Sequence, residues 1–395
     1  MIYTDFKGKQ LSLLGFGTMR LPVDEHKAID QTQLEEMVDY AMAHGVNYFD
    51  TACPYHDGLS EIAIGKALKK YPRESWYLAD KFPGHQISAS YDPKACFEEQ
   101  LEKCGVEYFD FYLLHNVYEK SIETYLDPRW NILPYFLEQK RLGRIKHLGF
   151  STHGRVDLME KFLDICGDEM EFCQIQLNYL DWTLQDAKAK VELLKERNIP
   201  VWVMEPVRGG KLCQLPAEDE AVLRGLRPEE GIPAWGFRFL QSIPTVKMVL
   251  SGMSNLAQMQ DNIRTFEERR NLSVKELEAL MEIAEHLKDS VPCTACRYCT
   301  PHCPRGLDIP MLLATYNELK VERALNIGMR MEALPVGKRP SDCIGCGLCA
   351  RMCPQNIAIP VELKNLAKVL EEMPRWADVC AQRDAIKARQ KAEGK

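Results

Sequence analysis

Eight of the fifteen cysteines in this chain of 395 residues fall into two runs of identical spacing. Each run holds three thiols separated by two residues and a fourth that follows after three more, directly before a proline. Thiols spaced in this way can converge in a tight loop. A disulfide framework does not fit so long a chain without a secretion signal. The two runs are Cys293-x2-Cys296-x2-Cys299-x3-Cys303-Pro304 and Cys343-x2-Cys346-x2-Cys349-x3-Cys353-Pro354.

The spacing of both runs is the bacterial ferredoxin pattern for cubane clusters. Three thiolates wrap one face of a [4Fe–4S] cube, and the fourth is displaced and reaches the other cube. Two complete runs argue against two zinc sites, which favour paired CxxC units. Gly345 and Gly347 would let backbone amides approach the cluster sulfurs. We therefore predict two ligand sets: Cys293, Cys296 and Cys299 with Cys353, and Cys343, Cys346 and Cys349 with Cys303.

Composition narrows the classes of partner. Lys and Arg total 50 and Asp and Glu total 57, so the formal net charge of −7 gives no basic excess for nucleic acid or an anionic membrane. The sequence has no apolar run of about 18 residues, so we expect no membrane-spanning helix. The first residues lack the charged-then-apolar order of a secretory signal. We therefore expect a cytoplasmic protein without membrane insertion.

Short apolar runs alternate with longer amphipathic ones from about residue 10 to residue 250. The short runs are rich in aromatic and β-branched residues, which is typical of buried parallel strands. Asp92-Pro93 provides an N-cap and a proline for the first helical position of one connection. Eight alternations predict an α/β fold, a (β/α)8 TIM barrel, in preference to an open doubly wound sheet. The expected strands are residues 14–18, 47–50, 76–81, 111–115, 147–151, 172–178, 201–205 and 247–251.

A domain boundary follows the barrel pattern. Ser273-Val274-Lys275-Glu276 is a capping box that opens a helix to about Leu287, and Ser290-Val291-Pro292 then interrupts it. Residues 310–328 have a helical pattern, and the charged, Ala-rich tail after Asp378 predicts a surface helix that frays. We therefore expect a barrel in residues 1–288, followed in residues 289–395 by a small, mainly α-helical ferredoxin-like dicluster domain and a helical tail.

Polar residues stand at the ends of successive predicted strands. Asp50, Lys81 and His115 end the second, third and fourth strands, and Tyr55 follows Asp50 by five residues. Each alone could be a helix cap, a surface lysine, a core histidine or a packing tyrosine. Active sites of such barrels lie at the C-terminal ends of the strands, so the joint occurrence predicts one catalytic site.

These residues resemble the aldo/keto reductase superfamily over about residues 1–270. The whole chain is similar to the bacterial and archaeal subgroup in which such a barrel is fused to a ferredoxin-type dicluster tail. The resemblance implies reduction of an aldehyde or ketone by hydride from NADP(H) or NAD(H). It is carried by Gly15-Phe16-Gly17-Thr18-Met19, the Asp50–Tyr55 run, Lys81, Leu113-Leu114-His115, Gly149-Phe150-Ser151, Gln174 and Met204-Glu205-Pro206-Val207-Arg208-Gly209-Gly210.

The resemblance makes Tyr55 the general acid. A carbonyl that accepts hydride develops negative charge on oxygen, and a placed proton donor stabilises that charge. A nearby Lys81 ammonium would lower the pKa of Tyr55, and Asp50 would pair with Lys81 and offset its burial. His115 would hydrogen-bond the carbonyl and orient it.

The same resemblance implies the cofactor contacts. Ser151 and Gln174 would bind the nicotinamide carboxamide, although Gln176 shares the strand face of Gln174. Met204 stands where the family often stacks a tyrosine, and Gln258 where it often has an arginine for the 2′-phosphate, so neither favours NADPH. The further expected contacts are Gly17, Thr18 and Met19, the loop residues Pro206, Arg208, Gly209 and Gly210, and Ser254, Gln258 and Asn262 near the adenosine.

Hydride transfer moves two electrons together, whereas each cubane moves one, and a flavin is the usual adapter. Our leading hypothesis is a nicotinamide-dependent reductase of a small carbonyl or alcohol substrate, with structural or redox-sensing clusters. The second hypothesis is a ferredoxin-linked oxidoreductase with FMN in the barrel and a redox protein partner that feeds the clusters. The third is a nonenzymatic regulatory barrel, against which the four polar residues argue.

Overall fold

The computed structural model describes residues 1–288, 291, 293, 295–353, 355 and 357–392. It divides into two compact units, residues 1–281 with the end of α17 (Trp376–Ala392), and residues 282–384. Ser290 and Pro292 of the expected boundary, and Pro354 of the second cysteine run, lie outside the described residues. In the described part, every helix is too short or too polar to span a bilayer.

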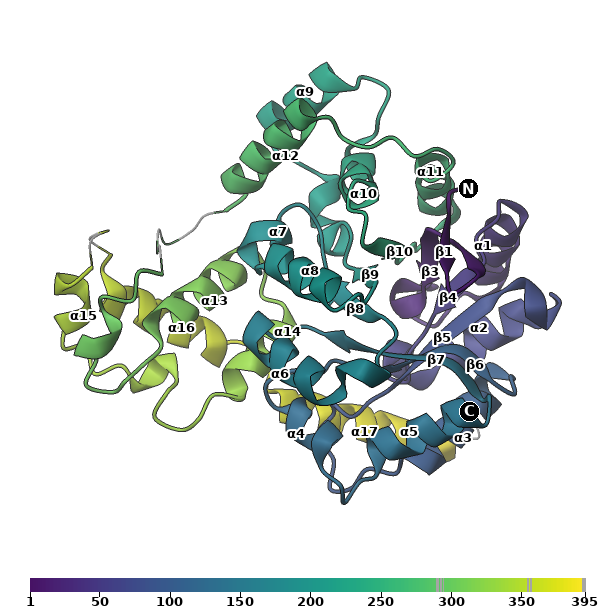
Figure 1. The fold of residues 1–395 in the computed structure, drawn as a ribbon, viewed down its shortest axis with the longest axis horizontal. Coiled ribbons are helices and arrows are strands. Elements are labelled where there is room, and N and C mark those ends of the chain that lie inside the picture. The colour runs from purple at the N-terminus through teal and green to yellow at the C-terminus, as the bar shows by residue number, and fades with distance from the viewer. Residues whose placement is uncertain (289–290, 292, 294, 354, 356, 393–395) are drawn as a thin grey trace. The chain divides into compact units, whose positions relative to one another are not determined.

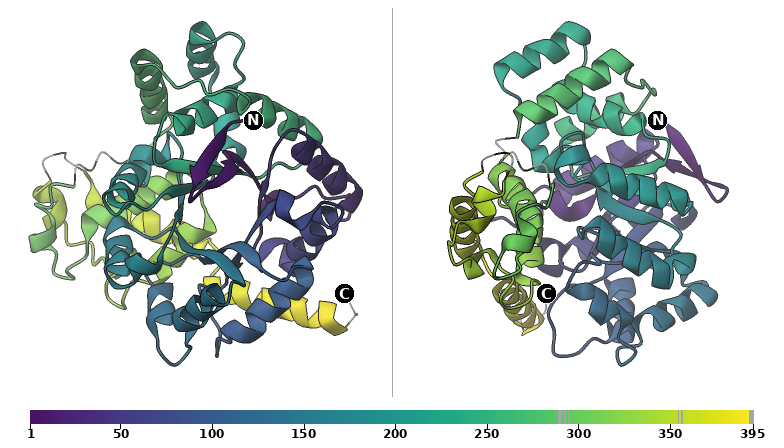
Figure 2. Two further views of the ribbon diagram at one scale, coloured as in Figure 1. Left: turned by 45° about the vertical axis from the view of Figure 1, so that its right-hand side comes forward. Right: turned by 60° about the vertical axis from the view of Figure 1, so that its left-hand side comes forward.

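The first unit is a (β/α)8 barrel, as predicted. Among its described residues, eight parallel strands close in the order β10-β3-β4-β5-β6-β7-β8-β9, with helices around them (Figures 1 and 2). Each expected strand is present, with its ends within two residues of the prediction. The strands are β3 (Leu14–Gly17), β4 (Tyr48–Asp50), β5 (Tyr77–Phe82), β6 (Phe109–Leu114), β7 (Ile145–Thr152), β8 (Cys173–Gln176), β9 (Val201–Met204) and β10 (Val246–Ser251).

The predicted helix starts have the expected caps. The side chain of Asp92 accepts a hydrogen bond from the backbone N–H of Ala95, with Pro93 in the first turn. Both halves of the capping box are present, since the N–H of Ser273 donates to Glu276 at 2.7 Å and the N–H of Glu276 donates to the Ser273 hydroxyl at 3.3 Å. The helices of this region are α1 (Gln31–Ala43), α2 (Ser60–Leu68), α3 (Pro93–Cys104), α4 (Ser121–Leu126), α5 (Ile132–Arg141), α6 (Val156–Cys166), α7 (Asp181–Leu184), α8 (Ala187–Glu196), α9 (Ala217–Leu226), α10 (Ile232–Gln241), α11 (Leu256–Thr265) and α12 (Val274–His286).

A hairpin that we did not predict precedes the barrel. Strands β1 (Tyr3–Phe6) and β2 (Lys9–Ser12) pair antiparallel, and the two turn residues between them have φ of 52° and 82°. Phe6 and Leu11 pack into one core cluster with barrel residues that include Trp202. This cluster also contains Tyr48, the first residue of β4, so the hairpin fills the N-terminal end of the barrel. The opposite mouth is left for the strand ends that carry the polar residues.

The second unit is helical, as predicted, but the segment 310–328 is not one helix. Glu322 has extended backbone angles, which end α13 and let α14 turn back. Glu318 of α13 and Arg330 of α14 form an ion pair with both side chains below 9% exposure, and this pair ties the two helices together. The helices are α13 (Ile309–Val321), α14 (Leu325–Glu332), α15 (Leu348–Arg351) and α16 (Ile359–Glu371).

We expect opposite effects from two glycine substitutions in the first unit. A Cβ on Gly65 in α2 would lie 2.4 Å from the carbonyl oxygen of Cys104, so Gly65→Ala should destabilise the barrel by about 1–3 kcal/mol. A Cβ on Gly225 in α9 meets no heavy atom within 4 Å, so Gly225→Ala should stabilise it by about 0.5–1 kcal/mol. Anaerobic urea unfolding followed by tryptophan fluorescence measures both. Equal stability of the two variants would refute the close approach of α2 and α3.

Candidate functional site

Four predicted residues meet at the C-terminal mouth of the barrel. Asp50 ends β4, Lys81 lies near the end of β5, His115 follows β6, and Tyr55 begins the 3₁₀ helix η2 (Tyr55–Gly58). The Lys81 Nζ atom donates to Asp50 Oδ1 and to the carbonyl oxygen of Thr51, each at 2.6 Å. The same atom lies 5.0 Å from the centroid of the Tyr55 ring. The rings of Tyr55 and His115 are edge to face with centroids 6.2 Å apart, so the four side chains form one cluster.

Burial and neighbouring charges have opposing effects on the pKa values of Lys81 and Tyr55. The side chain of Lys81 has 0% exposure and that of Asp50 has 3%. Burial lowers the pKa of Lys81, but the Asp50 carboxylate and Tyr55 outweigh it, so the pKa is raised. Burial raises the pKa of Tyr55, and the opposing effect of Lys81 does not cancel it. Our expectation of a lowered pKa for Tyr55 was therefore wrong in its net direction, because desolvation of the phenolate is the larger effect.

His115 has neighbours that the sequence did not reveal. The ring of His85, which is 7% exposed, lies 4.4 Å from the His115 ring between centroids. The hydroxyl of Tyr125 in α4 donates to the carbonyl oxygen of His115 at 2.6 Å and to that of Phe82 at 3.1 Å. The Tyr125 hydroxyl therefore holds the backbone of His115 and that of Phe82 at the end of β5. A histidine three residues past a strand end carries no sequence signal by itself.

The loop after Tyr55 has a strained backbone. His56 and Asp57 both have left-handed angles, with φ of 49° and 54°. The backbone N–H of Leu21 donates to His56 Nε2 at 3.1 Å, which requires a neutral acceptor nitrogen. Burial lowers the pKa of His56, in agreement with this role as an acceptor. The contact anchors the segment that carries Tyr55.

The residues expected at the nicotinamide lie on three adjacent strands. The Ser151 hydroxyl oxygen accepts a hydrogen bond from the N–H of Asn116 at 2.8 Å. Gln174 Nε2 lies 3.7 Å from the Met204 sulfur, and Gln174 Oε1 is buried without a hydrogen-bond partner among the described residues. Gln176 instead donates to Asp181 at 2.8 Å. The two glutamines therefore face different partners, and Gln174 is the one with an oxygen to offer.

Arg208 lies in the expected loop but is not exposed. Its guanidinium forms an ion pair with Asp181, and the two side chains have 1% and 0% exposure. Asp181, which we did not single out, also accepts hydrogen bonds from Gln176 and Asn178 at 2.8 and 2.6 Å. A phosphate that binds Arg208 would have to compete with this carboxylate.

The neighbouring loop residues have an unusual backbone. Pro206 precedes the 3₁₀ helix η5 (Arg208–Cys213), in which Gly209 and Gly210 have φ of 63° and 99°. A Cβ on Gly209 would lie 2.7 Å from the Arg20 guanidinium, so glycine permits this approach. Arg20, also missed from the sequence, lies 3.7 Å from a Glu205 carboxylate oxygen.

The remaining expected cofactor residues flank β3 and β10. Gly17 ends β3, the hydroxyl of Thr18 donates to the carbonyl oxygen of Asp50 at 2.9 Å, and Met19 is 56% exposed. The N–H of Ser254 donates to the side chain of Gln258 at 2.8 Å. Asn262 is buried and donates to the hydroxyl of Ser251 at 3.0 Å. Ser254 and Gln258 are exposed, whereas the side chain of Asn262 in α11 is already hydrogen-bonded to Ser251 at the end of β10.

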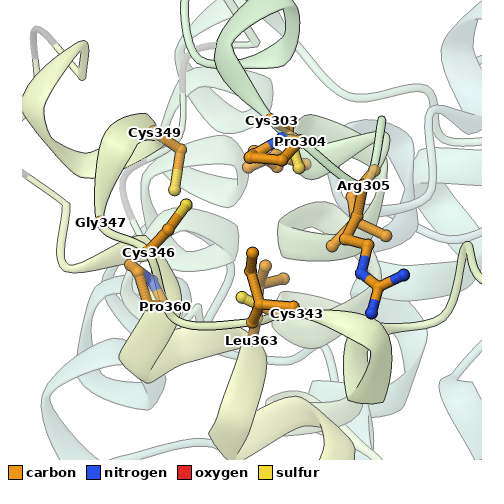
Figure 3. A pocket seen from close by; sticks show the side chains of 12 residues that line it. Cys303, Pro304, Arg305, Cys343, Cys346, Gly347, Cys349, Pro360 and Leu363 are labelled. Atoms are coloured by element: carbon orange, nitrogen blue, oxygen red, sulfur yellow. The ribbon is translucent and has the colours of Figure 1, made fainter.

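The cysteines line two cavities, each with thiols from both runs. Cavity A is lined by Cys293, Cys296, Cys299 and Cys353, and cavity B by Cys303, Cys343, Cys346 and Cys349. Figure 3 shows the side chains around cavity B. Four thiols around one cavity could ligate a cubane, and each cavity has the crosswise composition of one expected ligand set.

The two cysteine loops share a backbone conformation but not the residues that suit it. Gly345 and Gly347 have φ of 67° and 72°, and Ala295 and Arg297 at the corresponding positions of the first run have φ of 55° and 63°. A left-handed conformation costs about 1–2 kcal/mol for a residue with a Cβ. The first loop therefore stores strain that the glycines of the second loop avoid.

Ala295→Gly should relieve this strain and make the second unit more resistant to unfolding by about 1 kcal/mol. Gly345→Ala is the matched change in the other direction, because a Cβ there meets no heavy atom of the protein within 4 Å and must adopt the left-handed conformation. The measurement is the urea midpoint for loss of cluster absorbance under anaerobic conditions. A lower midpoint for Ala295→Gly would contradict the strained conformation.

Comparisons with known proteins agree with the barrel and the cysteine cavities. Residues 13–301 match the aldo/keto reductase family, and residues 292–358 match a 4Fe-4S dicluster domain. L-galactose dehydrogenase of Arabidopsis thaliana is 26% identical over 315 residues, which cover 71% of this chain and 93% of that protein. NADH-specific methylglyoxal reductase of Escherichia coli is 24% identical over 287 residues, which cover 62% and 85%.

Two further comparisons set the extent of the similarity. Probable aldo-keto reductase 1 of Glycine max is 28% identical over 212 residues, 52% of this chain and 58% of that protein, so the chain spans little more than half of that relative. The solved structure of an aldo-keto reductase from Bacillus halodurans in its holo form has a TM-score of 0.57 at 25% identity, with 70% of this chain and 93% of that chain covered. Since the family match extends over more than half of its length, the chain belongs to the aldo/keto reductase family and carries a 4Fe–4S dicluster domain.

Proposed function

We propose that the protein reduces an aldehyde or ketone by hydride transfer from NADH or NADPH, with Tyr55 as proton donor, and that it binds two [4Fe–4S] clusters. The barrel would occupy residues 1–288 and the cluster domain residues 289–395. The single observation that carries the proposal is the contact of the buried Lys81 ammonium with Asp50 and the Tyr55 ring. A nonenzymatic barrel would have no need of a buried cation beside a phenol.

The four side chains at the barrel mouth can together hold and release a proton at the Tyr55 oxygen. Burial keeps the pKa of Tyr55 above its ordinary value, so the phenol keeps its proton until a stronger base forms beside it. Lys81, charged because Asp50 pairs with it, then stabilises the phenolate that remains. His115, edge to face with the Tyr55 ring, can orient the carbonyl group by a hydrogen bond.

Residues of the barrel also fit the nicotinamide cofactor, which supplies the hydride when bound. The buried, unpartnered Oε1 of Gln174 suits an amide N–H, and Ser151 lies opposite Gln174 in the strand register. Gln258 cannot replace an arginine as a 2′-phosphate partner, so we expect no strong preference for NADPH. The named relatives act on methylglyoxal and L-galactose, which supports a small carbonyl or alcohol substrate.

Tyr55→Phe should lower kcat/KM for carbonyl reduction by about 10²–10⁴-fold, because a placed general acid contributes that much. Tyr91→Phe is the control, since the Tyr91 hydroxyl donates to the Gln86 carbonyl oxygen in the loop after β5 rather than to one of the four mouth residues. The assay is anaerobic oxidation of NADH or NADPH with methylglyoxal or 4-nitrobenzaldehyde. An unchanged rate in Tyr55→Phe sinks the acid assignment, and a stoichiometric flavin in the purified protein would favour the flavin alternative.

The pH profile of kcat follows from the raised pKa of Tyr55. An acid with a raised pKa stays protonated across the neutral range, so the reductive rate should not fall from tyrosine ionisation below about pH 10. Lys81→Met removes the cation that favours phenolate and should move this limb to still higher pH. A fall of kcat near neutral pH that disappears in Tyr55→Phe would show that the pKa of Tyr55 is not raised.

The crosswise cysteine sets predict different iron contents for two double variants. The intact chain should contain about eight irons from two cubanes. Cys303→Ser with Cys343→Ser removes two ligands of cavity B and should leave about four irons, whereas Cys303→Ser with Cys293→Ser damages both cavities and should leave almost none. Anaerobic iron and sulfide determination distinguishes the two. The reverse result would mean that each run binds its own cluster.

A further inference from the structure

The two cysteine cavities differ in the charge beside them. We propose that the two clusters have different reduction potentials, and that the cluster in cavity B takes up the first electron because Arg305 stands beside it with no acidic ion-pair partner among the described residues. This inference rests on the clusters of the proposed function. It adds an order of reduction and names the residue that sets it.

The two cavities are alike in the exposure of their cysteines and in the backbone conformation of their loops, so they differ mainly in the charge beside them. The third cysteine of each run, Cys299 or Cys349, is buried, and the second, Cys296 or Cys346, is exposed. The remaining four ligands are all half-buried. Both loops also pass through the same left-handed backbone positions. Because solvent exposure and backbone geometry are alike, neither separates the two potentials.

Each cavity has one charged residue in its lining, Arg297 in cavity A and Arg305 in cavity B. The Arg297 guanidinium lies 3.3 Å from the Asp308 carboxylate, so its charge is compensated. The Arg305 guanidinium has no ion pair among the described residues, and Figure 3 shows its side chain along the rim of cavity B, across from Cys346 and Cys349. The lining charge is therefore positive at cavity B and balanced at cavity A.

Charged groups just outside the lining do not reverse this difference. The Lys338 ammonium donates to the carbonyl oxygens of Arg305 and Gly306 at 2.8 and 3.1 Å, so a second cation lies near the loop of cavity B. Asp342, which precedes Cys343, accepts a hydrogen bond from the backbone N–H of Arg339, so one carboxylate also lies near this loop. Arg305 is the cation that belongs to the lining of cavity B, whereas the side chains of Lys338 and Arg339 donate to backbone carbonyl oxygens.

An added electron makes a cluster more negative, so an uncompensated cation nearby favours the reduced form. Arg305 is exposed, and water weakens its effect. We expect a shift of about threefold in the reduction equilibrium, which is about 28 mV for one electron at 59 mV per tenfold change.

The test is an anaerobic redox titration of the full-length protein, with dithionite as the electron source and the reduced clusters followed by electron paramagnetic resonance. Arg305→Gln should lower the higher of the two potentials and leave the lower one in place. Arg297→Gln is the matched control and should change the lower potential less, because it removes a cation that is already paired. Asp308→Asn should raise the lower potential, because it frees Arg297.

Iron content distinguishes a failure of the proposed order of reduction from a failure of the proposed cluster binding. With about eight irons per chain, two equal potentials, or a shift of the lower potential in Arg305→Gln, would overturn the proposed order while the clusters themselves stand. A chain that binds no [4Fe–4S] cluster would instead contradict the proposed function. Unchanged iron content in the variants shows that a shifted potential reports charge and not damage to the site.

Discussion

The ion pair between Lys81 and Asp50 is the interaction on which the mouth of the barrel depends. Both side chains are almost completely buried, so water compensates neither charge. Removal of one partner from such a pair typically costs 3–5 kcal/mol, because the other charge remains buried and alone. The barrel makes the pair possible, since β4 and β5 are adjacent parallel strands whose C-terminal ends lie at the same edge. The position of the ammonium beside the Tyr55 ring follows from this pairing.

A second buried ion pair anchors the loop after β9. Arg208 and Asp181 neutralise each other, and the backbone nearby is left-handed at Glu205, Gly209 and Gly210. A loop held in such a conformation depends on its contacts to stay there. The same arginine that resembles a phosphate ligand in sequence is therefore a structural anchor in this conformation, and one residue cannot serve both partners fully at once.

Regular features of the fold were accessible from the sequence because they depend on local patterns. The strands, the Asp92 cap and the Ser273–Glu276 capping box reflect periodicity and hydrogen bonding over a few residues. The break between α13 and α14 was not accessible, because the extended backbone at Glu322 and the pairing of Glu318 with Arg330 across the two helices belong to no local pattern.

Some residues of the candidate site could likewise be predicted from the sequence, and others could not. Asp50, Lys81, His115 and Tyr55 could be selected because strand ends converge in a barrel. His85 and Asp181 could not, because their roles arise from contacts between separate loops. The direction of the pKa shift of Tyr55 was also beyond the sequence, since it depends on how far the mouth excludes water.

The crosswise lining of the two cavities has a consequence for how the second unit is assembled. Each cavity takes three thiols from one run and one from the other, so a metal centre in either cavity cross-links both ends of the intervening helices. Such a cross-link restricts the unfolded chain much as a disulfide does. The two proposed centres would therefore tether the first cysteine run to the second at two separate points of the chain.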